Sequence, residues 1–484
     1  MLATDPSDYL GYSVSTAGDV NGDGYDDVLV GAYGKDGFKG AVYVIYGHPK
    51  FSSSYISLDL AALDPATTGF SITGGGSGDF FGYSVSTAGR VNDDEYEDLL
   101  IAAPAKDSAK GMVYVIYGGP TSSRTNIDLT TTTLDPMTTG FTIAGMANGK
   151  NFGYSLSLAG DVNKDGYDDV IVGTPLENSN QGIAYVIYGG MSSKMSNIDL
   201  ATTMLDPMST GFWIKGNSAG DYFGFSVGKA GDVNKDGYDD VIIGAPVKDS
   251  NQGTAYVVYG ADKSGLANID LSTTQLYASG RGFTMIGSDS TGKFGRAVGP
   301  AGDVNGDGYA DIIVGAPTAD GRKGIAYVIY GGEGMPNIPL ATSPLDPGTT
   351  GFTITGETAQ DLLGISVGLA GDVNGDGYSD LIIGASSKAG NTGAAYVIYG
   401  GPKGDRSDIN LGIMALDPAG TGFTITGNTP GDQLGGSVGT AGDVNGDGYD
   451  DIVIGASSKD TNQGAAYVLY SSSFLLRIVF NFMN

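Results

Sequence analysis

A ten-residue segment that recurs seven times along the chain constrains this sequence more than any other feature. Its first copy, residues 18–27, reads Gly-Asp-Val-Asn-Gly-Asp-Gly-Tyr-Asp-Asp. The second residue of each copy falls at position 19, 90, 161, 232, 303, 372 or 443, so the spacing is 71 residues except for one interval of 69. A fixed spacing of this kind indicates one structural unit used repeatedly. We therefore expect residues 1–484 to form a single domain of seven repeats without linkers.

Each repeat predicts four short strands separated by glycine-rich turns, and glycine supplies 82 of the 484 residues. In the first repeat residues 11–17 carry small side chains, residues 28–30 are apolar throughout, residues 41–46 are mostly apolar, and residues 70–73 alternate. Small side chains suit strands crowded at an axis, and unbroken apolar runs suit strands covered on both faces. We therefore predict an all-β fold, a seven-bladed β-propeller of four-stranded antiparallel blades, in preference to a β-solenoid.

The seventh blade lacks a predicted outer strand. Six outer strands are predicted, at Phe70, Phe141, Phe212, Phe283, Phe352 and Phe423, and a seventh would fall beyond the last residue. The final segment, residues 471–484, is an atypical apolar tail. We expect this tail to close the last blade, or the blade to be incomplete.

The repeated loop has the pattern Asp-x-Asn-x-Asp-Gly-x-x-Asp, which suits a hard cation. Ca²⁺ takes six to eight oxygen ligands, and side chains at alternate positions 1, 3 and 5 of a tight loop can point at one centre. Glycine at position 6 permits the turn, the carbonyl at position 7 can ligate, and Asp at position 9 completes the set. An EF-hand would carry Glu at position 12, where this chain has Val30 or an equivalent apolar residue.

Six loops keep every one of these ligands, so we predict about six calcium sites. An Asx-rich turn without an ion is the alternative reading. The predicted ligands are Asp19, Asn21, Asp23, Tyr25 and Asp27; Asp161, Asn163, Asp165, Tyr167 and Asp169; Asp232, Asn234, Asp236, Tyr238 and Asp240; Asp303, Asn305, Asp307, Tyr309 and Asp311; Asp372, Asn374, Asp376, Tyr378 and Asp380; and Asp443, Asn445, Asp447, Tyr449 and Asp451.

The second loop departs from the pattern. It begins with Arg90 in place of Asp and has Glu95 in place of the turn glycine. We predict that no calcium binds there and that the Arg90 guanidinium pairs instead with Asp94 or Asp98.

These motifs resemble the FG-GAP repeat of the integrin α-subunit propeller. The name-giving pairs are Phe81-Gly82, Phe152-Gly153, Phe223-Gly224 and Phe294-Gly295, followed later by Gly244-Ala245-Pro246 and Gly315-Ala316-Pro317. Leu10, Leu363 and Leu434 replace the phenylalanine, and Ser386 and Ser457 replace the proline. The resemblance implies a seven-bladed propeller with calcium in the hairpins between the first and second strands, and a role in ligand binding at cell surfaces or in secreted proteins.

In a four-stranded blade the loops between strands 1 and 2 and between strands 3 and 4 share one face. We therefore expect the calcium loops and the Asn-Ile-Asp-Leu inserts, such as residues 197–200, on that face. The opposite face should carry 11 of the 25 basic residues. They are Lys35, Lys39, Lys106, Lys110, Lys150, Lys248, Lys293, Arg322, Lys323, Lys388 and Lys459.

All of these except Lys150 and Lys293 form a predicted ligand face for an acidic protein or glycan. Ordinary solvation of exposed turns is the alternative. Tyr33, Phe38, Phe80 and Tyr222 would add contact area if they are exposed.

The composition excludes further classes of partner and of chemistry. The net charge of −29 argues against nucleic acid and anionic membranes as partners. The chain has no cysteine and one histidine, His48, which we expect in a turn. No apolar run is long enough to cross a membrane, and no signal peptide is visible.

The sequence therefore predicts a calcium-stabilised, non-enzymatic module for adhesion or ligand recognition, extracellular or at the cell surface, because weak calcium sites would be empty in cytosol. The alternatives are the non-catalytic propeller portion of a secreted enzyme acting on glycans or lipid anchors, and a purely structural array.

Overall fold

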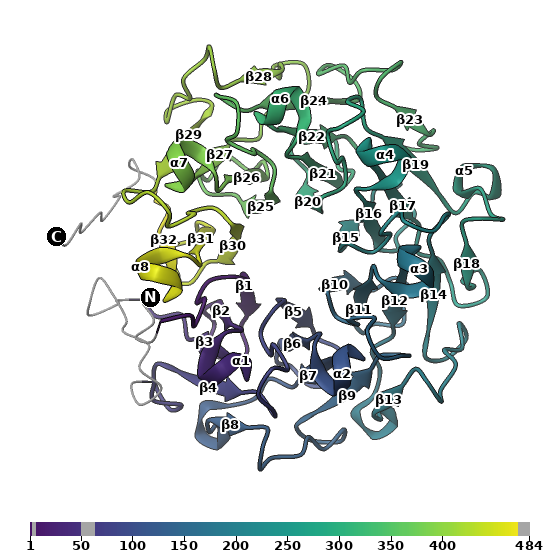
Figure 1. Cartoon of the computed structure of the whole chain (residues 1–484), viewed down its shortest axis with the longest axis vertical. Coiled ribbons are helices and arrows are strands. Elements are labelled where there is room, and N and C mark those ends of the chain that lie inside the picture. The colour runs from purple at the N-terminus through teal and green to yellow at the C-terminus, as the bar shows by residue number, and fades with distance from the viewer. Residues whose placement is uncertain (2–5, 50–62, 473–484) are drawn as a thin grey trace.

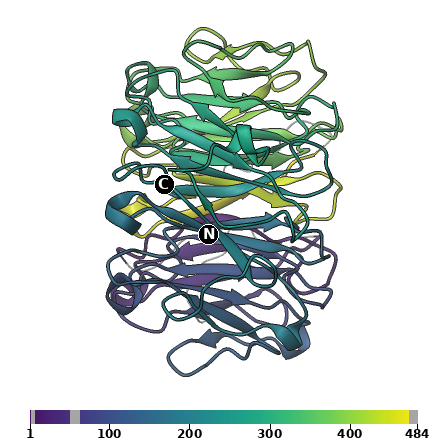
Figure 2. The ribbon, with the colours of Figure 1, turned by 90° about the vertical axis from the view of Figure 1, so that its right-hand side faces the viewer.

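The computed structural model describes residues 1, 6–49 and 63–472, and these form seven β-sheets arranged radially around one axis (Figure 1). Figure 2 shows the resulting disc from its edge. The predicted seven-bladed all-β propeller is confirmed.

The strands follow the order predicted from side-chain size. The innermost strands are β1 (Val14–Gly18), β5 (Val85–Gly89), β10 (Ser155–Gly160), β15 (Ser226–Gly231), β20 (Ala297–Gly302), β25 (Ser366–Gly371) and β30 (Ser437–Gly442). The second strands are β2 (Asp27–Ala32), β6 (Asp98–Ala103), β11 (Asp169–Thr174), β16 (Asp240–Ala245), β21 (Asp311–Ala316), β26 (Asp380–Ala385) and β31 (Asp451–Ala456). Every residue of the second strands is buried, as the unbroken apolar runs predict.

The third and fourth strands complete each antiparallel meander. The third strands are β3 (Ala41–Ile45), β7 (Met112–Ile116), β12 (Ile183–Ile187), β17 (Thr254–Val258), β22 (Ile325–Ile329), β27 (Ala394–Ile398) and β32 (Ala465–Leu469). The fourth strands are β4 (Gly69–Thr73), β9 (Gly140–Ala144), β14 (Gly211–Lys215), β19 (Gly282–Ile286), β24 (Gly351–Thr355) and β29 (Gly422–Thr426).

Short helical turns join the second and third strands. They are α1 (Lys35–Phe38), α2 (Lys106–Ala109), α3 (Glu177–Asn180), α4 (Lys248–Asn251), α6 (Ala319–Arg322), α7 (Lys388–Asn391) and α8 (Lys459–Asn462). Their central residues are left-handed, for example Asp36 at φ 50° and Gly37 at φ 66°. The segments between the third and fourth strands contain η1 (Thr121–Ser123), η2 (Ser192–Lys194) and α5 (Leu276–Ser279).

Five blades have a fifth strand, which corrects the prediction of four. These two-residue strands are β8 (Ile127–Asp128), β13 (Ile198–Asp199), β18 (Ile269–Asp270), β23 (Ile338–Pro339) and β28 (Ile409–Asn410). Each comes from the insert of the following repeat and pairs in parallel with the fourth strand of the preceding blade. The Asn-Ile-Asp motifs therefore lie on the outer edge (Figure 1). The first residues of the inserts contact the calcium loops, as Lys263 does at Asp165, so the expectation that the inserts lie on the calcium-loop face is correct only for that first part.

The motif in these inserts explains the contact. Asn126 Oδ1 accepts a hydrogen bond from the Ser71 N–H at 2.9 Å, Ile127 pairs with Ile72, and Asp128 forms an ion pair with Lys39 at 3.7 Å. The same Asn side-chain contact recurs between Asn197 and Thr142. Asn-Ile-Asp is thus a clasp on the preceding blade.

Adjacent blades approach closely at paired glycines. A Cβ atom on Gly31 of β2 would lie 2.2 Å from the carbonyl oxygen of Gly82 in the next blade, so no larger side chain fits. Gly455 of β31 faces Gly11 in the same way, at 2.0 Å. The contact between the last and first blades is therefore equivalent to the contacts between consecutive blades.

The seventh blade shows three strands within the described residues, β30, β31 and β32. The Met1 amino group donates to the Ala466 carbonyl at 2.7 Å, and the Ala466 N–H donates back at 3.2 Å, so residue 1 pairs with β32. The apolar tail that we expect to close this blade lies almost entirely outside the described residues.

Candidate calcium loops and ligand surface

All six predicted calcium loops are tight hairpins between a first and a second strand, as the strand order requires. The carboxylate at position 1 shapes each loop. Asp19 Oδ1 accepts hydrogen bonds from the Gly22 and Asp23 N–H groups at 2.7 and 3.0 Å, and Oδ2 accepts from Gly24 at 2.9 Å. Position 5 contributes too, because Asp23 Oδ1 accepts from the Tyr25 N–H. Asp303, Asp372 and Asp443 repeat this pattern.

The carboxylate at position 9 is fully buried in every loop. Asp27 Oδ2 accepts from the Val20 N–H at 3.1 Å and Oδ1 accepts from Gly47 at 2.8 Å. Burial raises the pKa of Asp27 and Asp169 well above the ordinary value. Burial raises the pKa of Asp240, Asp311 and Asp451 to about 8, and that of Asp380 to about 7. An ionised carboxylate at this position therefore lacks a compensating positive charge.

Two further observations bear on whether these residues fit a calcium ion. The Asn21 and Asn163 Oδ1 atoms at position 3 are buried and accept no hydrogen bond, and a buried oxygen without a donor is costly. Every side-chain atom predicted to ligate the ion is an oxygen, the element that Ca²⁺ prefers. Among the described residues, however, no three acidic or histidine side chains are gathered closely enough to hold an ion. The chemistry of the predicted ligand atoms therefore suits calcium. The hydrogen bonds accepted by the position-1 carboxylate hold the loop in shape without an ion.

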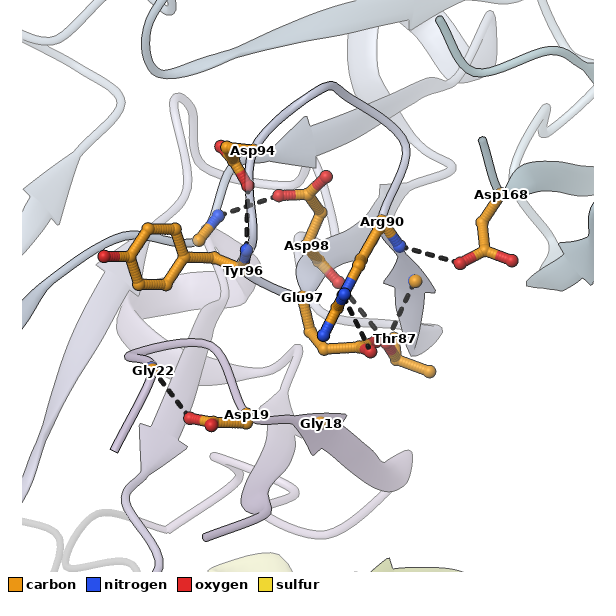
Figure 3. Close-up of polar contacts among 12 residues, drawn as sticks. Gly18, Asp19, Gly22, Thr87, Arg90, Asp94, Tyr96, Glu97, Asp98 and Asp168 are labelled. Carbon is orange, nitrogen blue, oxygen red and sulfur yellow. Dashed lines mark hydrogen bonds and ion pairs between the residues drawn. The ribbon is translucent and has the colours of Figure 1, made fainter. Parts of the chain in front are cut away.

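Neighbouring loops are linked through position 8, which the sequence analysis did not single out. The Asp168 carboxylate accepts a hydrogen bond from the Arg90 N–H of the preceding loop at 2.8 Å (Figure 3). Asp239 and Asp450 make the same contact with Asp161 and Asp372 at 3.0 and 2.8 Å. The signal was present in the sequence as an acidic residue at position 8 in five of the seven loops.

The tyrosine at position 7 reinforces this link. The Tyr96 ring lies against Gly22 of the preceding loop, where an added Cβ would approach Cε1 to 2.7 Å (Figure 3). Where position 4 is lysine, the ammonium group lies over the ring instead, as Lys164 does over Tyr238 at 5.3 Å. The predicted role of the position-7 carbonyl as a ligand stays a prediction.

The second loop has the same fold without the full ligand set. Asp98 is buried and accepts hydrogen bonds from Val91 and Gly118. Arg90 Nε lies 3.9 Å from Glu97 Oε1, so the predicted pairing with Asp94 or Asp98 is wrong (Figure 3). Glu97 stands at position 8, where other loops carry the linking carboxylate.

On the opposite face, most of the predicted ligand-face cations form ion pairs. Lys35 pairs with Asp8 at 3.1 Å, and both side chains are about 5% exposed. The other pairs are Lys39–Asp128, Lys106–Asp79, Lys110–Asp199, Lys248–Asp221, Lys323–Asp320, Lys388–Glu357 and Lys459–Asp432. Much of the predicted positive charge is thus neutralised locally.

Arg322 is the exception among these nine cations within the described residues. It lines a pocket of about 460 Å³ together with residues 358–362 and Asn391. Asp361 also lines this pocket, so its wall carries both signs of charge.

Aromatic side chains gather on this same face, around the inner ends of the first blades. In the first five repeats, the residue that follows the Phe-Gly or Leu-Gly pair contacts its counterpart in the neighbouring blade. Tyr12 and Tyr83 lie 5.0 Å apart, Tyr83 and Tyr154 5.6 Å, and Tyr154 and Phe225 5.0 Å, and the Arg296 guanidinium lies 4.3 Å from the Phe225 ring. We call these five residues the aromatic arc.

A second aromatic group extends the arc outward. Tyr33 contacts Tyr12, Tyr83, Phe38 and Phe80 with ring centroids 4.7 to 6.0 Å apart. Tyr12 and Phe38 are each 37% exposed. Three of the four aromatic residues predicted for this face, Tyr33, Phe38 and Phe80, therefore belong to one aromatic group beside the arc. The arc itself was not predicted from the sequence.

Comparison with known proteins agrees with this geometry. Six segments match the model described as "FG-GAP repeat": residues 10–45, 152–187, 223–258, 294–329, 363–398 and 435–469. The chain carries six FG-GAP repeats. The matched segments do not include the second repeat, where the Arg90 loop departs from the pattern.

Integrin α subunits are similar to part of the chain, which confirms the resemblance. Integrin alpha pat-2 of Caenorhabditis elegans is 34% identical over 254 residues, covering 49% of this chain and 18% of the relative. Integrin alpha-PS2 of Drosophila melanogaster is 34% identical over 240 residues, covering 49% and 15%. Integrin alpha-5 of Xenopus laevis is 28% identical over 243 residues, covering 48% and 20%. The chain thus spans about a fifth or less of these relatives.

A search of the described residues for a helix with the length and apolarity needed to cross a membrane finds none.

Proposed function

We propose that this FG-GAP propeller is a calcium-stabilised recognition module that acts outside the cell and binds a protein or glycan ligand without catalysing a reaction. Calcium would lie in the six loops that keep the complete pattern. The observation that carries this part is the fully buried carboxylate at position 9, exemplified by Asp27, whose ionised form lacks a positive charge.

When bound, calcium would supply that charge and take oxygen ligands from positions 1, 3, 5 and 9. The chain's own contribution is to hold the loop: Asp19 binds three successive N–H groups, and Asn21 Oδ1 is left buried and without a donor. Sites of the extracellular kind bind calcium at about 10⁻⁴ to 10⁻³ M, which supports an exterior location.

A thermal melt in EDTA and in ~1 mM calcium tests the metal. Six sites with a dissociation constant of about 10⁻⁴ M would each stabilise the fold by roughly 1.4 kcal/mol, or ~8 kcal/mol together if independent. We expect a large rise in melting temperature with calcium and none with the same concentration of potassium. An unchanged melting temperature would contradict the proposed calcium sites. It would also contradict the exterior location, which is argued from weak calcium binding.

Recognition is supported by the aromatic arc, together with the similarity to integrin α subunits. Aromatic side chains that are partly exposed and contiguous supply large contact area at little entropic cost. The test is binding of calcium-loaded protein to a panel of matrix proteins and acidic glycans, with the Tyr83→Ala/Tyr154→Ala double variant as comparison. Loss of binding with an unchanged melt would support the arc as the ligand surface.

The predicted basic ligand face remains a second candidate surface. Because eight of its nine cations are paired, Arg322 in its pocket is the residue to test. Binding of an acidic ligand that weakens in Arg322→Glu but not in the arc variant would favour this face. Turnover of a glycan or lipid-anchor substrate by the isolated chain would contradict a non-enzymatic role.

A further inference from the structure

Two of the predicted calcium loops already hold a positive charge supplied by the chain. The Lys263 ammonium lies 2.8 Å from Asp165 Oδ2, and the Lys403 ammonium lies 2.8 Å from Asp307 Oδ2. Both aspartates stand at position 5, a predicted ligand, in the loops of the third and fifth repeats.

The two lysines are held by equivalent surroundings. Each follows by three residues a glycine, Gly260 or Gly400, whose N–H binds the position-9 carboxylate of its own blade. Each ammonium also lies over a tyrosine ring of the preceding blade, Lys263 over Tyr188 at 5.5 Å and Lys403 over Tyr330 at 5.6 Å. The arrangement is built twice by the repeat, which distinguishes it from a chance surface ion pair.

The first, second and fourth loops receive an uncharged residue at this place, and the equivalent residues for the sixth and seventh loops, Phe474 and Lys50, lie outside the described residues. Ser192 binds Asp93 in the loop that lacks the calcium pattern, through its N–H at 2.8 Å and its hydroxyl. The positions that would reach the first and fourth loops are Thr121 and Gly334. Within the described residues, Asp23 and Asp236 form no ion pair with a lysine or arginine. At position 5, the third and fifth loops therefore differ in charge from the first and fourth.

The third loop has an independent feature, beside the lysine, that points to a ligand. Asn163 is 5% exposed and its Oδ1 atom accepts no hydrogen bond. A lysine ammonium on Asp165 neutralises one carboxylate and leaves this oxygen unsatisfied. The lysine thus replaces only part of what a calcium ion would do.

We propose that Lys263 and Lys403 are tethered counter-cations, which hold the third and fifth loops in shape without calcium and make them bind calcium more weakly than the first and fourth loops. The proposal rests on the proposed calcium function. Its physical basis is that a divalent ion must displace the ammonium from the shared carboxylate or bind beside a like charge. The lysines are about one-third exposed, so solvent weakens the repulsion without removing it.

The test compares the wild type with the double variant Lys263→Gln/Lys403→Gln by calorimetric calcium titration and by thermal melts. We expect the wild type to show at least two classes of site, and the variant to show two sites that bind calcium about tenfold tighter or more. In EDTA the variant should melt below the wild type, and in saturating calcium this difference should disappear. The matched control is Lys215→Gln, which removes an equally short ion pair, to Asp270 at 2.8 Å, on the outer edge. The control should shift the melts in EDTA and in calcium equally.

The outcomes separate the two proposals. If the wild type shows neither binding heat nor a calcium-dependent melt, the calcium function fails, and the lysine proposal with it. If the wild type binds calcium but the double variant titrates identically and melts with the same calcium dependence, the calcium function stands and the lysines are only surface ion pairs.

Discussion

The Asp26 carboxylate accepts a hydrogen bond at 2.9 Å from the backbone N–H of Asp443, 417 residues later in the chain. It is the position-8 contact that links consecutive loops elsewhere, here joining the last repeat to the first. His48 makes a parallel contact between the same two repeats, donating its backbone N–H to the Val444 carbonyl at 2.8 Å, and it lies outside the helices and strands in the connection after β3. The contact between the last and first loops is therefore of the same kind as the contacts between consecutive loops.

The fifth repeat lacks this side-chain contact because its position 8 is Ala310. Ser379 shows that a hydroxyl suffices, since its Oγ accepts from the Asp303 N–H at 3.2 Å. We expect Ala310→Ser to supply an acceptor for Asp232 and raise the unfolding free energy by about 0.5–1 kcal/mol. Chemical denaturation measures this, with Ser379→Ala as the reverse control. A destabilised Ala310→Ser protein would mean that the site has no room for the hydroxyl.

The glycine contact between blades predicts a steric effect. In Gly244→Ala the new Cβ would lie 2.0 Å from the Gly295 carbonyl oxygen, so the blades must separate. We expect a loss of about 1–3 kcal/mol in unfolding free energy, as for other overpacked sites. Ala102 occupies this position in the second repeat, and Ala102→Gly is the control, with a smaller change expected. Equal effects of the two substitutions would contradict close approach as the cause.

The calcium proposal predicts how many ions each loop variant loses. Asp236→Ala in the fourth loop should lower the calorimetric stoichiometry by one. Asp94→Ala alters the same position of the second loop, whose Oδ1 accepts a tyrosine N–H in the same way, at 2.9 Å against 3.0 Å. We expect no change in stoichiometry for Asp94→Ala. A lost ion in both variants would place calcium in the Arg90 loop as well.

The buried position-9 carboxylates predict an unusual pH dependence without calcium. Their pKa values, about 8 for Asp240, Asp311 and Asp451, lie above the unfolded value of ~3.9. A raised folded pKa stabilises the fold below the unfolded pKa, and this stabilisation is lost as pH rises from about 4 to about 8.

Melting temperature in EDTA should therefore fall between pH 5 and pH 8, and calcium should raise it most at pH 8. Calcium should not abolish the slope, because Asp98 in the second loop stays buried with a raised pKa. Stability in EDTA that increased over this range would show that these carboxyls are ionised without a metal.

The repeat period, the strand order and the position of the loops could all be predicted from sequence, because each depends on local pattern. A hydrophobic run such as residues 28–30 reports burial on both faces wherever it lies. What could not be predicted depends on the neighbouring blade. Asp168 and Asn126 act on residues 78 and 55 positions away, and no local pattern identifies those partners.

The basic face shows the same limit. The strand order correctly places Lys35 and Lys106 on one side of the disc. Their acidic partners come from other segments: Asp79 from the loop that connects the first two blades, and Asp8 from the segment before β1. Net charge along the sequence does not reveal such pairing. The aromatic arc was missed because its members are single residues about 71 positions apart.

The exchanged fifth strand makes the boundaries of the structural unit differ from those of the repeat. Because β8 belongs to the second repeat in sequence and to the first blade in space, one repeat cut out alone would leave its outer strand uncovered and would carry an unpaired clasp. An exposed edge strand invites association with another chain. Removal or insertion of a single repeat would therefore disturb two blades. A rearrangement of the repeats that keeps the protein soluble must move each blade together with the Asn-Ile-Asp strand that the following repeat supplies to it.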